Sequence, residues 1–310
     1  MPRRFAAAAL LLLSCASPPP PPPLPPCAPG TAGVPLAFEL RAPDGRQAFL
    51  QGSVHFAREA EAGLDPRAQR ALAEADVLVG ELDMAALTPV ESAELLIELG
   101  RLPEGQRLQD VLAPETWTLL QERADETGVV LQPLELLEPW VAAIVFLGFS
   151  LQQAGYTPEQ GVELQVYASE RPQQTRGLET IQEQFALFDD LPLDAQEHML
   201  LDALRPSDES AIELESMFAA WRCGDAAALE GVLSEMMASD PKLSGFYEAT
   251  IFTRNETMAK GVEKVVSESG RAFIVVGALH LVGARGIPAL LEQAGFQVEQ
   301  LRAEQPPAAP

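Results

Sequence analysis

Two of the three histidines in this 310-residue chain follow a glycine at the same spacing. His55 stands in QGSVH and His280 in GALH, so each lies three positions after its glycine, Gly52 or Gly277. Glycine at the end of a strand adopts backbone angles that other residues avoid, and it lets another group approach closely. A histidine three positions further on can then present an imidazole nitrogen at the edge of a sheet.

Two imidazoles and one carboxylate form a common ligand set for a divalent metal with open coordination positions. Glu81, in VLVGELD, is the expected carboxylate, and Asp83 on the same strand face could orient a ligand or base from behind it. A histidine after a strand is also commonly a hydrogen-bonded structural residue. His198 lies in an expected helix and is interpreted as a surface residue. The repeated pattern favours metal ligands at His55 and His280.

The two histidines belong to two copies of the same kind of unit. An apolar strand over 47–54 is followed by a helix over 65–75 and a buried strand over 76–84. Near the C-terminus, a strand over 271–280 is again followed by a helix and by a last strand over 296–302. Such units usually place parallel strands side by side with a right-handed crossover. Both histidines should then lie at carboxyl ends of strands, where open α/β sheets bind ligands.

The chain between these units is predicted to be a large helical insert. Apolar positions recur every three or four residues in seven segments, namely 88–99, 115–127, 134–154, 158–170, 192–204, 208–221 and 225–238. A short strand-like segment over 173–179 interrupts them. The predicted fold class is α/β (α+β), with a central mixed sheet built from the two strand–GxxH–helix–strand units and capped by the insert.

The first residues are expected to be removed or anchored rather than folded. MPRRFAAAALLLLSC has the form of a secretory signal, and LLSC resembles a bacterial lipobox in which Cys15 is lipidated. An ordinary cleaved signal is the alternative. Residues 16–33 are proline-rich and favour an extended spacer. The domain is predicted over 34–302, followed by a disordered tail over 303–310.

Composition excludes some classes of function. The formal net charge is −24, which disfavours a nucleic-acid partner because phosphate binding needs clustered lysine and arginine. The apolar stretch over 140–151 is shorter than the roughly 20 residues of a membrane span, and it is interpreted as a buried helix. Cys27 and Cys223 could pair, but nothing in the sequence requires it. No G-x-S-x-G, H-E-x-x-H, phosphate-loop or dinucleotide motif occurs.

Three further residues are candidates for the site. Glu179 precedes an expected helix and could point into a cleft, or it could offset the helix dipole. Arg254 and Asn255 stand just before another expected helix. The planar guanidinium of Arg254 could bind a carboxylate or an oxyanion, or it could form an ordinary ion pair.

Five ordered blocks of the sequence resemble the TraB/PrgY/GumN family, which includes the animal Tiki proteins. They are LQGSVHF, ALAEADVLVGELD, GVELQVYASERPQQTRGLETIQEQF, FTRNETMAKGV and FIVVGALHLVG followed by GIPALLEQAGFQVEQL. The resemblance covers about residues 47–301. It implies a Tiki/erythromycin-esterase-like fold and a hydrolase that depends on a divalent metal such as manganese, cobalt or zinc.

Matched residue by residue, the resemblance implies a site of His55, Glu81 and His280, with supporting positions at Arg254, Asn255, Glu179 and Glu163. Glu163 stands where the family more often has aspartate, so it could be a ligand or a helix cap. The metal would activate a bound water. Glu81 would ligate the metal or act as general base, and Arg254 would stabilise the oxyanion.

The predicted function is a metal-dependent hydrolase, most simply a peptidase acting on a peptide or protein. The N-terminal lipid would anchor it in the cell envelope. The expected membrane is the outer membrane, and the protein would face either the periplasm or the exterior. One alternative is a non-catalytic lipoprotein that sequesters a peptide or another ligand on the same scaffold. Another is a structural envelope factor with both histidines in its core.

Overall fold

The computed structural model describes residues 26–58, 63–169, 172, 174–205, 207–239 and 243–303. Within them one six-stranded mixed sheet has the order β4–β3–β5–β2–β1–β6, which confirms the predicted fold class. Neighbours among β4, β3, β5 and β2 are parallel, and β1 is antiparallel to both of its neighbours. The strands are β1 (Ala37–Arg41), β2 (Gln47–Ser53), β3 (Val77–Gly80), β4 (Gln174–Gly177), β5 (Arg271–Gly277) and β6 (Gln297–Gln300).

The two strand–helix–strand units are present, but the expectation that each places its strands side by side is wrong. β5 lies between β2 and β3, and both β2 and β1 lie between β5 and β6. The central place of β5 fits its sequence, because AFIVV is an uninterrupted apolar run and all five of its residues are buried. A strand that is apolar on both sides has to be covered on both faces. This order brings the strand of His280 between the strands that precede His55 and Glu81.

The four parallel strands end together at one edge of the sheet. Gly177 of β4 pairs with Gly80 of β3, and Gly277 of β5 pairs with Ser53 of β2. One titratable side chain follows each of these strand ends within three residues: Glu179, Glu81, His280 and His55. The prediction that both histidines stand at carboxyl ends of strands is confirmed.

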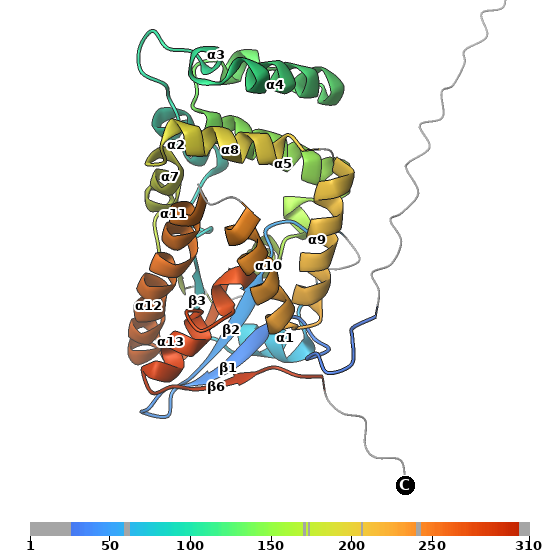
Figure 1. Ribbon diagram of the computed structural model, residues 1–310. Helices are drawn as coiled ribbons and strands as arrows, with labels where there is room; N and C mark the ends of the chain where they lie inside the picture. The colour runs from blue at the N-terminus through green and yellow to red at the C-terminus, as the bar shows by residue number, and fades with distance from the viewer. Residues whose placement is uncertain are drawn as a thin grey trace, which may run out of the picture.

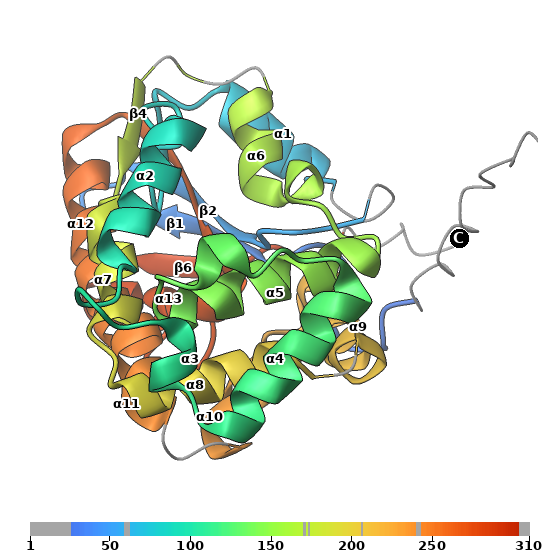
Figure 2. The same cartoon turned by 90° about the horizontal axis from the view of Figure 1, so that it is seen from above.

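Helices cover both faces of the sheet. Figure 2 shows α1 (Pro66–Ala73) on one side of the strands and α13 (Ile287–Gln293) on the other. α1 begins as the sequence predicts, because the carboxylate of Asp65 accepts a hydrogen bond from the N–H of Arg67 and proline takes the first position. α12 (Arg254–Glu268) packs against β5 with buried residues such as Met258 and Val262.

The insert between β3 and β5 is mainly helical, as the apolar spacing predicts. Figure 1 shows α3, α4, α5 and α8 stacked beyond one end of the sheet, where Trp140, Leu120 and Leu200 form part of a second hydrophobic core. Its helices are α2 (Pro89–Leu99), α3 (Leu108–Val111), α4 (Pro114–Thr127), α5 (Pro139–Gln153), α6 (Val162–Ala168), α7 (Ile181–Asp189), α8 (Leu193–Ala203), α9 (Ser207–Arg222), α10 (Ala226–Ser239) and α11 (Ser244–Tyr247).

Three details of the insert refine the predictions. The helix expected over 134–154 begins only at Pro139, after a 3₁₀ turn at Gln132–Leu134. No helix in the described ranges has the length and apolarity needed to cross a bilayer. A π-helical segment, Glu248–Thr253, leads directly into α12.

Cys27 and Cys223 form a disulfide, which settles a pairing that the sequence leaves open. The bond joins the segment before β1 to the residue after α9, across 196 positions of the chain. The signal, the lipobox at Cys15, the first part of the spacer and the tail after residue 303 lie outside the described residues.

Candidate functional site

A buried guanidinium joins two carboxylates at the carboxyl edge of the sheet. Nη2 of Arg254 donates to Oε2 of Glu81 at 2.6 Å and to Oε2 of Glu179 at 2.8 Å. Nε of the same arginine donates to both oxygens of Glu179, at 3.1 and 3.0 Å. The three side chains are 15%, 6% and 8% exposed for Arg254, Glu81 and Glu179. They therefore form an ion-paired cluster that is largely shielded from water.

Close backbone approaches at glycines shape this edge. β3 ends at Gly80 because the chain folds back at once, and a Cβ there would lie 2.5 Å from the carbonyl oxygen of Leu82. At Gly277 the backbone N–H donates to Oε1 of Glu81 at 2.6 Å, and a Cβ would lie 3.1 Å from that oxygen. Gly277 therefore allows the carboxylate to seat against the end of β5. Gly52 has a different role, since a Cβ there would press on the backbone of Leu36.

His280 completes the cluster on its buried side. Its Nδ1 lies 2.6 Å from Oδ1 of Asn255, whose own amide nitrogen donates to the carbonyl of Arg285 at 2.8 Å. Because the amide nitrogen of Asn255 is engaged there, its oxygen faces the imidazole and Nδ1 carries the proton. Nε2 of His280 then holds its lone pair toward Nη1 of Arg254, 3.3 Å away, and lies 3.8 Å from Oε1 of Glu81.

Burial and charge set the protonation states of this cluster. Burial alone would raise the pKa of Glu81, but the neighbouring histidine and arginine charges and the N–H of Gly277 outweigh it and lower the pKa. Burial lowers the pKa of His280 to about 4, so this imidazole is neutral at neutral pH. Arg254 is then the lasting positive partner of Glu81, and nearby carboxylates raise its pKa against the opposing effect of burial.

His55 lies on the open side of the site and is paired with Glu163. Its Nδ1 is 2.5 Å from Oε2 of Glu163, and its side chain is 65% exposed. The negative charge of Glu163 is the main cause that raises the pKa of His55 to about 9, and the partial burial of the imidazole opposes it with a smaller effect. With Nδ1 held by the carboxylate, the second ring nitrogen is the one left to act on a ligand.

Gly161 brings the two members of this pair together. It precedes α6, and a Cβ at this position would overlap the carbonyl group of His55. The N–H of the next residue, Val162, donates to the carbonyl of Val54 at 3.0 Å. Glu163 in the first turn of α6 can therefore reach the imidazole only because glycine stands two positions before it.

A cavity of about 280 Å³ opens beside these groups. Its polar lining comes from His55, Glu81, Glu163 and Gln184. The other lining residues, mostly apolar, are Phe56, Gly80, Leu82, Met84, Pro158, Leu164 and Tyr167. A mostly apolar cavity with a few convergent polar groups is typical of a small-ligand or catalytic site.

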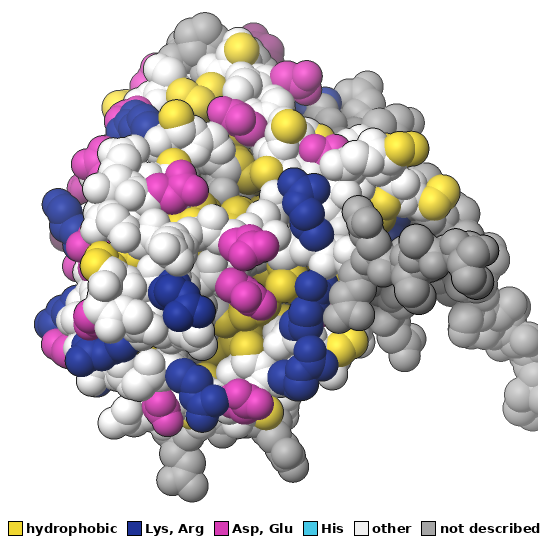
Figure 3. All heavy atoms as spheres, turned by 90° about the horizontal axis from the view of Figure 1, so that it is seen from below, with side chains coloured by type: hydrophobic (Ala, Val, Ile, Leu, Met, Phe, Trp, Pro, Cys, Tyr) yellow, Lys and Arg dark blue, Asp and Glu magenta, His cyan; other side chains and the backbone are white. Residues whose placement is uncertain are grey.

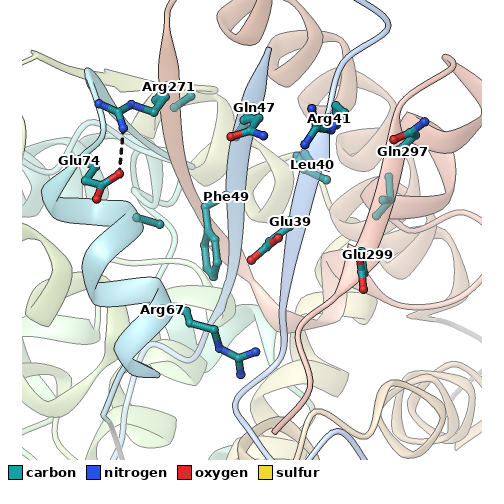
Figure 4. Close-up of a pocket in the computed structure, with 14 residues that line it drawn as sticks. Glu39, Leu40, Arg41, Gln47, Phe49, Arg67, Glu74, Arg271, Gln297 and Glu299 are labelled. Atoms are coloured by element: carbon teal, nitrogen blue, oxygen red, sulfur yellow. Dashed lines mark hydrogen bonds and ion pairs between the residues drawn. The ribbon is translucent and has the colours of Figure 1, made fainter. Parts of the chain in front are cut away.

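A larger groove, of about 550 Å³, lies at the opposite edge of the sheet. It is lined by first residues of parallel strands, such as Gln47 and Arg271, by Arg67 of α1 and by Glu74, which directly follows this helix. Figure 4 shows Phe49 at its floor and the ion pair between Arg271 and Glu74 at one side. Figure 3 shows acidic and basic side chains around apolar patches on the surface at this end of the molecule. Because none of the candidate residues lines this groove, we place the site at the smaller cavity.

The structure corrects the strand face expected for Asp83 and limits the role expected for Arg254. Asp83 does not share a strand face with Glu81, because β3 ends before both residues; it instead accepts a hydrogen bond from the hydroxyl of Thr175 at 3.1 Å. Arg254 does not line the cavity, and its N–H groups already have acceptors, which include the carbonyl of Thr250 at 3.0 Å. It can therefore bind an oxyanion only by giving up one of these bonds.

Gln184 is a site residue that the sequence interpretation did not single out. Its amide nitrogen donates to Oε2 of Glu81 at 3.2 Å and to Oε2 of Glu179 at 3.3 Å. It lies on α7, in the block GLETIQEQF, so the only signal was its place in the first turns of the helix, five residues after Glu179. The pairing of Glu163 with His55 was likewise not predicted.

The residues as placed do not fit a divalent metal held jointly by His55, Glu81 and His280. The guanidinium of Arg254 lies against the two groups on the buried side, and it would repel a second cation there. Among the described residues, no three carboxylate, imidazole or thiol groups are grouped in a way that could hold a metal ion. Metal binding by this protein stays a prediction.

Comparison with known proteins agrees with this arrangement of motifs. The model of the TraB/PrgY/gumN family matches residues 38–300. The chain belongs to this family. Two relatives described as the uncharacterized protein YbaP, from Shigella flexneri and from Escherichia coli K12, are each 25% identical over 258 residues, covering 82% of this chain and 91% of theirs. No solved structure matches the chain significantly.

Proposed function

We propose that this family member is a hydrolase of the cell envelope that cleaves peptides, with His55 as the group that transfers the proton. The observation that carries the proposal is the pair of His55 and Glu163 beside the cavity, with the imidazole exposed and its Nδ1 held 2.5 Å from the carboxylate. A histidine oriented by a carboxylate is a recurrent general base in hydrolysis.

The chemistry assigned to this pair is simple proton transfer. In its neutral form, which predominates only above the raised pKa of about 9, the imidazole takes a proton from water as the water oxygen bonds to the peptide carbonyl carbon. The C–N bond then breaks, and the imidazolium returns the proton to the leaving nitrogen. Glu163 fixes the ring orientation and stabilises the imidazolium.

Glu81 is a poor candidate for the base. Both of its oxygens accept short hydrogen bonds, one from Gly277 and one from Arg254, and its lowered pKa makes it a weak proton acceptor. Its place on the cavity wall suits a role in holding Gln184 and Arg254 in position.

The apolar lining supports a substrate with an apolar side chain beside the bond that is cleaved. Phe56, Leu82 and Leu164 form part of that lining, and Met84, which is 37% exposed, forms part of it as well. A peptide rather than a nucleic acid is also consistent with the net charge of −24.

We also propose that lipidation of Cys15 anchors the protein in the envelope, in the outer membrane facing the periplasm or the exterior. The apolar run that ends at Cys15 supports the anchor. The disulfide between Cys27 and Cys223 supports a compartment outside the cytosol, because such bonds persist in oxidising surroundings.

The test is cleavage of a peptide library by the purified full chain, with and without manganese. His55→Ala should lower the rate by roughly 10²–10⁴-fold, the usual contribution of a general base. His198→Ala is the matched control, because it removes the third histidine, on α8. Cleavage at the wild-type rate by His55→Ala would refute the proposal. Cleavage that requires manganese would support the metal-dependent hydrolase that the family resemblance implies.

A second candidate is a binding protein that sequesters a peptide without cleaving it. The predominance of apolar residues in the cavity lining favours it, because such a pocket can hold a ligand without any reacting group. Library peptides that bind with unchanged mass after long incubation would support this function over hydrolysis.

A further inference from the structure

We propose that Arg254 fills a cation site of this protein, and that Glu81, Glu179 and His280 would close on a divalent metal ion only if its guanidinium were absent. The proposal goes beyond peptide cleavage, since it concerns which cation the buried cluster holds. It predicts that shortening Arg254 converts the cluster into a metal site.

Three metal-binding groups face the same guanidinium. Oε2 of Glu81 is 2.6 Å from Nη2, Oε2 of Glu179 is 2.8 Å from the same nitrogen, and Nε2 of His280 is 3.3 Å from Nη1. With the guanidinium between them, these three groups are not close enough together to hold a metal ion as placed. Two carboxylates and one imidazole are nevertheless a familiar ligand set for manganese, cobalt or zinc once they can close on one ion. The three groups thus converge on a single cation, and that cation is the side chain of Arg254.

The imidazole is already in the protonation state that a metal requires. Asn255 holds the proton on Nδ1 of His280, because its own amide nitrogen is bound to the carbonyl of Arg285. The lone pair of Nε2 is therefore directed into the cluster. A histidine ligand whose other nitrogen donates to a neighbouring oxygen is the usual arrangement at metal sites.

Charge explains why the guanidinium belongs there. Glu81 and Glu179 are 6% and 8% exposed, and two buried carboxylates need a positive partner close by. Arg254 supplies it from the first position of α12, directly after the π-helical segment, and Nη1 is further held by the carbonyl of Thr250. A divalent ion brought beside the guanidinium would be repelled at short range.

Removal of the guanidinium leaves the two carboxylates without their cation and frees the space it filled. In Arg254→Ala the uncompensated charge should be relieved by a bound divalent ion, since metal ions pair with buried carboxylates. We therefore expect Arg254→Ala to bind cobalt or manganese at least roughly tenfold more tightly than wild type does. Binding should also raise its melting temperature, because the ion binds the folded state.

In the first experiment the purified full chain is titrated with cobalt(II), and binding is measured from the absorption spectrum of the bound metal. In the second the chain is incubated with manganese(II), and its metal content is measured after dialysis. Arg254→Lys, which keeps the positive charge, and Arg285→Ala, which removes a surface arginine paired with Glu248, should behave as wild type. The double variant Arg254→Ala, His280→Ala should lose the binding that Arg254→Ala gains.

Two outcomes would overturn the proposal. One is a folded Arg254→Ala variant that binds no more metal than wild type. The other is a stoichiometric metal ion in the wild-type protein that is absent from Glu179→Gln or from His280→Ala. This second test does not depend on whether any Arg254 variant folds. Metal content reports on this cluster whether or not the protein cleaves peptides, so failure here and failure of the hydrolase proposal are distinguishable.

Discussion

Replacing Glu163 by glutamine removes the negative charge beside His55 and keeps the shape of the side chain. The charge of Glu163 is the largest cause that raises the pKa of His55 from 6.5 to about 9, and its hydrogen bond adds to it. Both contributions disappear in Glu163→Gln. Partial burial is then the largest remaining cause and lowers the pKa against the smaller raising effect of Glu81, and Arg254 lowers it further. We therefore expect the pKa of His55 to fall to 6.5 or below.

Nuclear magnetic resonance of the histidine side chains measures this directly. The chain has only three histidines, so His55→Asn and His198→Asn assign the signals by their loss. His280 is an internal reference, since its pKa of about 4 is set chiefly by burial and should not move in Glu163→Gln. A wild-type His55 that titrates near 6.5, or an unchanged pKa in Glu163→Gln, would refute the pairing.

The same pair contributes to stability with a definite sign. Because the pKa of His55 is raised on folding, its pairing stabilises the fold fully below pH 6.5, and the contribution is lost as the pH rises through about 9. The imidazole is 65% exposed, so solvent screening limits the contribution to about 1 kcal/mol or less. Urea unfolding at pH 6 should therefore show a slightly less stable Glu163→Gln variant, and the difference should vanish near pH 10.

Three further predictions concern other parts of the fold. Because folding lowers the pKa of His280 to about 4, the stability that its neutral form provides should be present above pH 6.5 and be lost as the pH falls through 4. The free energy of unfolding of His280→Gln in urea should lack this pH dependence. Cys223→Ser, which cannot pair with Cys27, should lower the free energy of unfolding by about 2–5 kcal/mol, and reductant should add nothing further in that variant. Gly161→Ala should cost about 1–3 kcal/mol by thermal unfolding through overlap with the neighbouring backbone, whereas its control Gly231→Ala, in α10 with open space around it, should be neutral or stabilising.

Local patterns in the sequence predicted most of the elements. The apolar spacing of the insert, the Asp65 cap of α1 and the uninterrupted apolar run of β5 depend on neighbours within a few residues, and each appears where expected. The end of β3 was predicted too late, because an apolar run does not show that the backbone of Gly80 folds back on Leu82. Strand order was not predicted either, since adjacency depends on which faces the whole sheet buries.

The site divides in the same way. The duplicated glycine–histidine spacing determined that His55 and His280 follow strand ends, because a strand and the turn after it are local structure. Only the tertiary structure separated the two histidines into different surroundings, one exposed beside Glu163 and one buried on Asn255.

The sequence by itself determined which residue types reach one edge of the sheet: two histidines, two glutamates and an arginine at the end of strands or the start of a helix. The tertiary structure decided their partners, because the β4–β3–β5–β2 order brings Glu179, Glu81 and His280 around Arg254. Ion pairing in a buried cluster depends on distances of a few ångströms between residues up to 173 positions apart, and no local pattern specifies such distances.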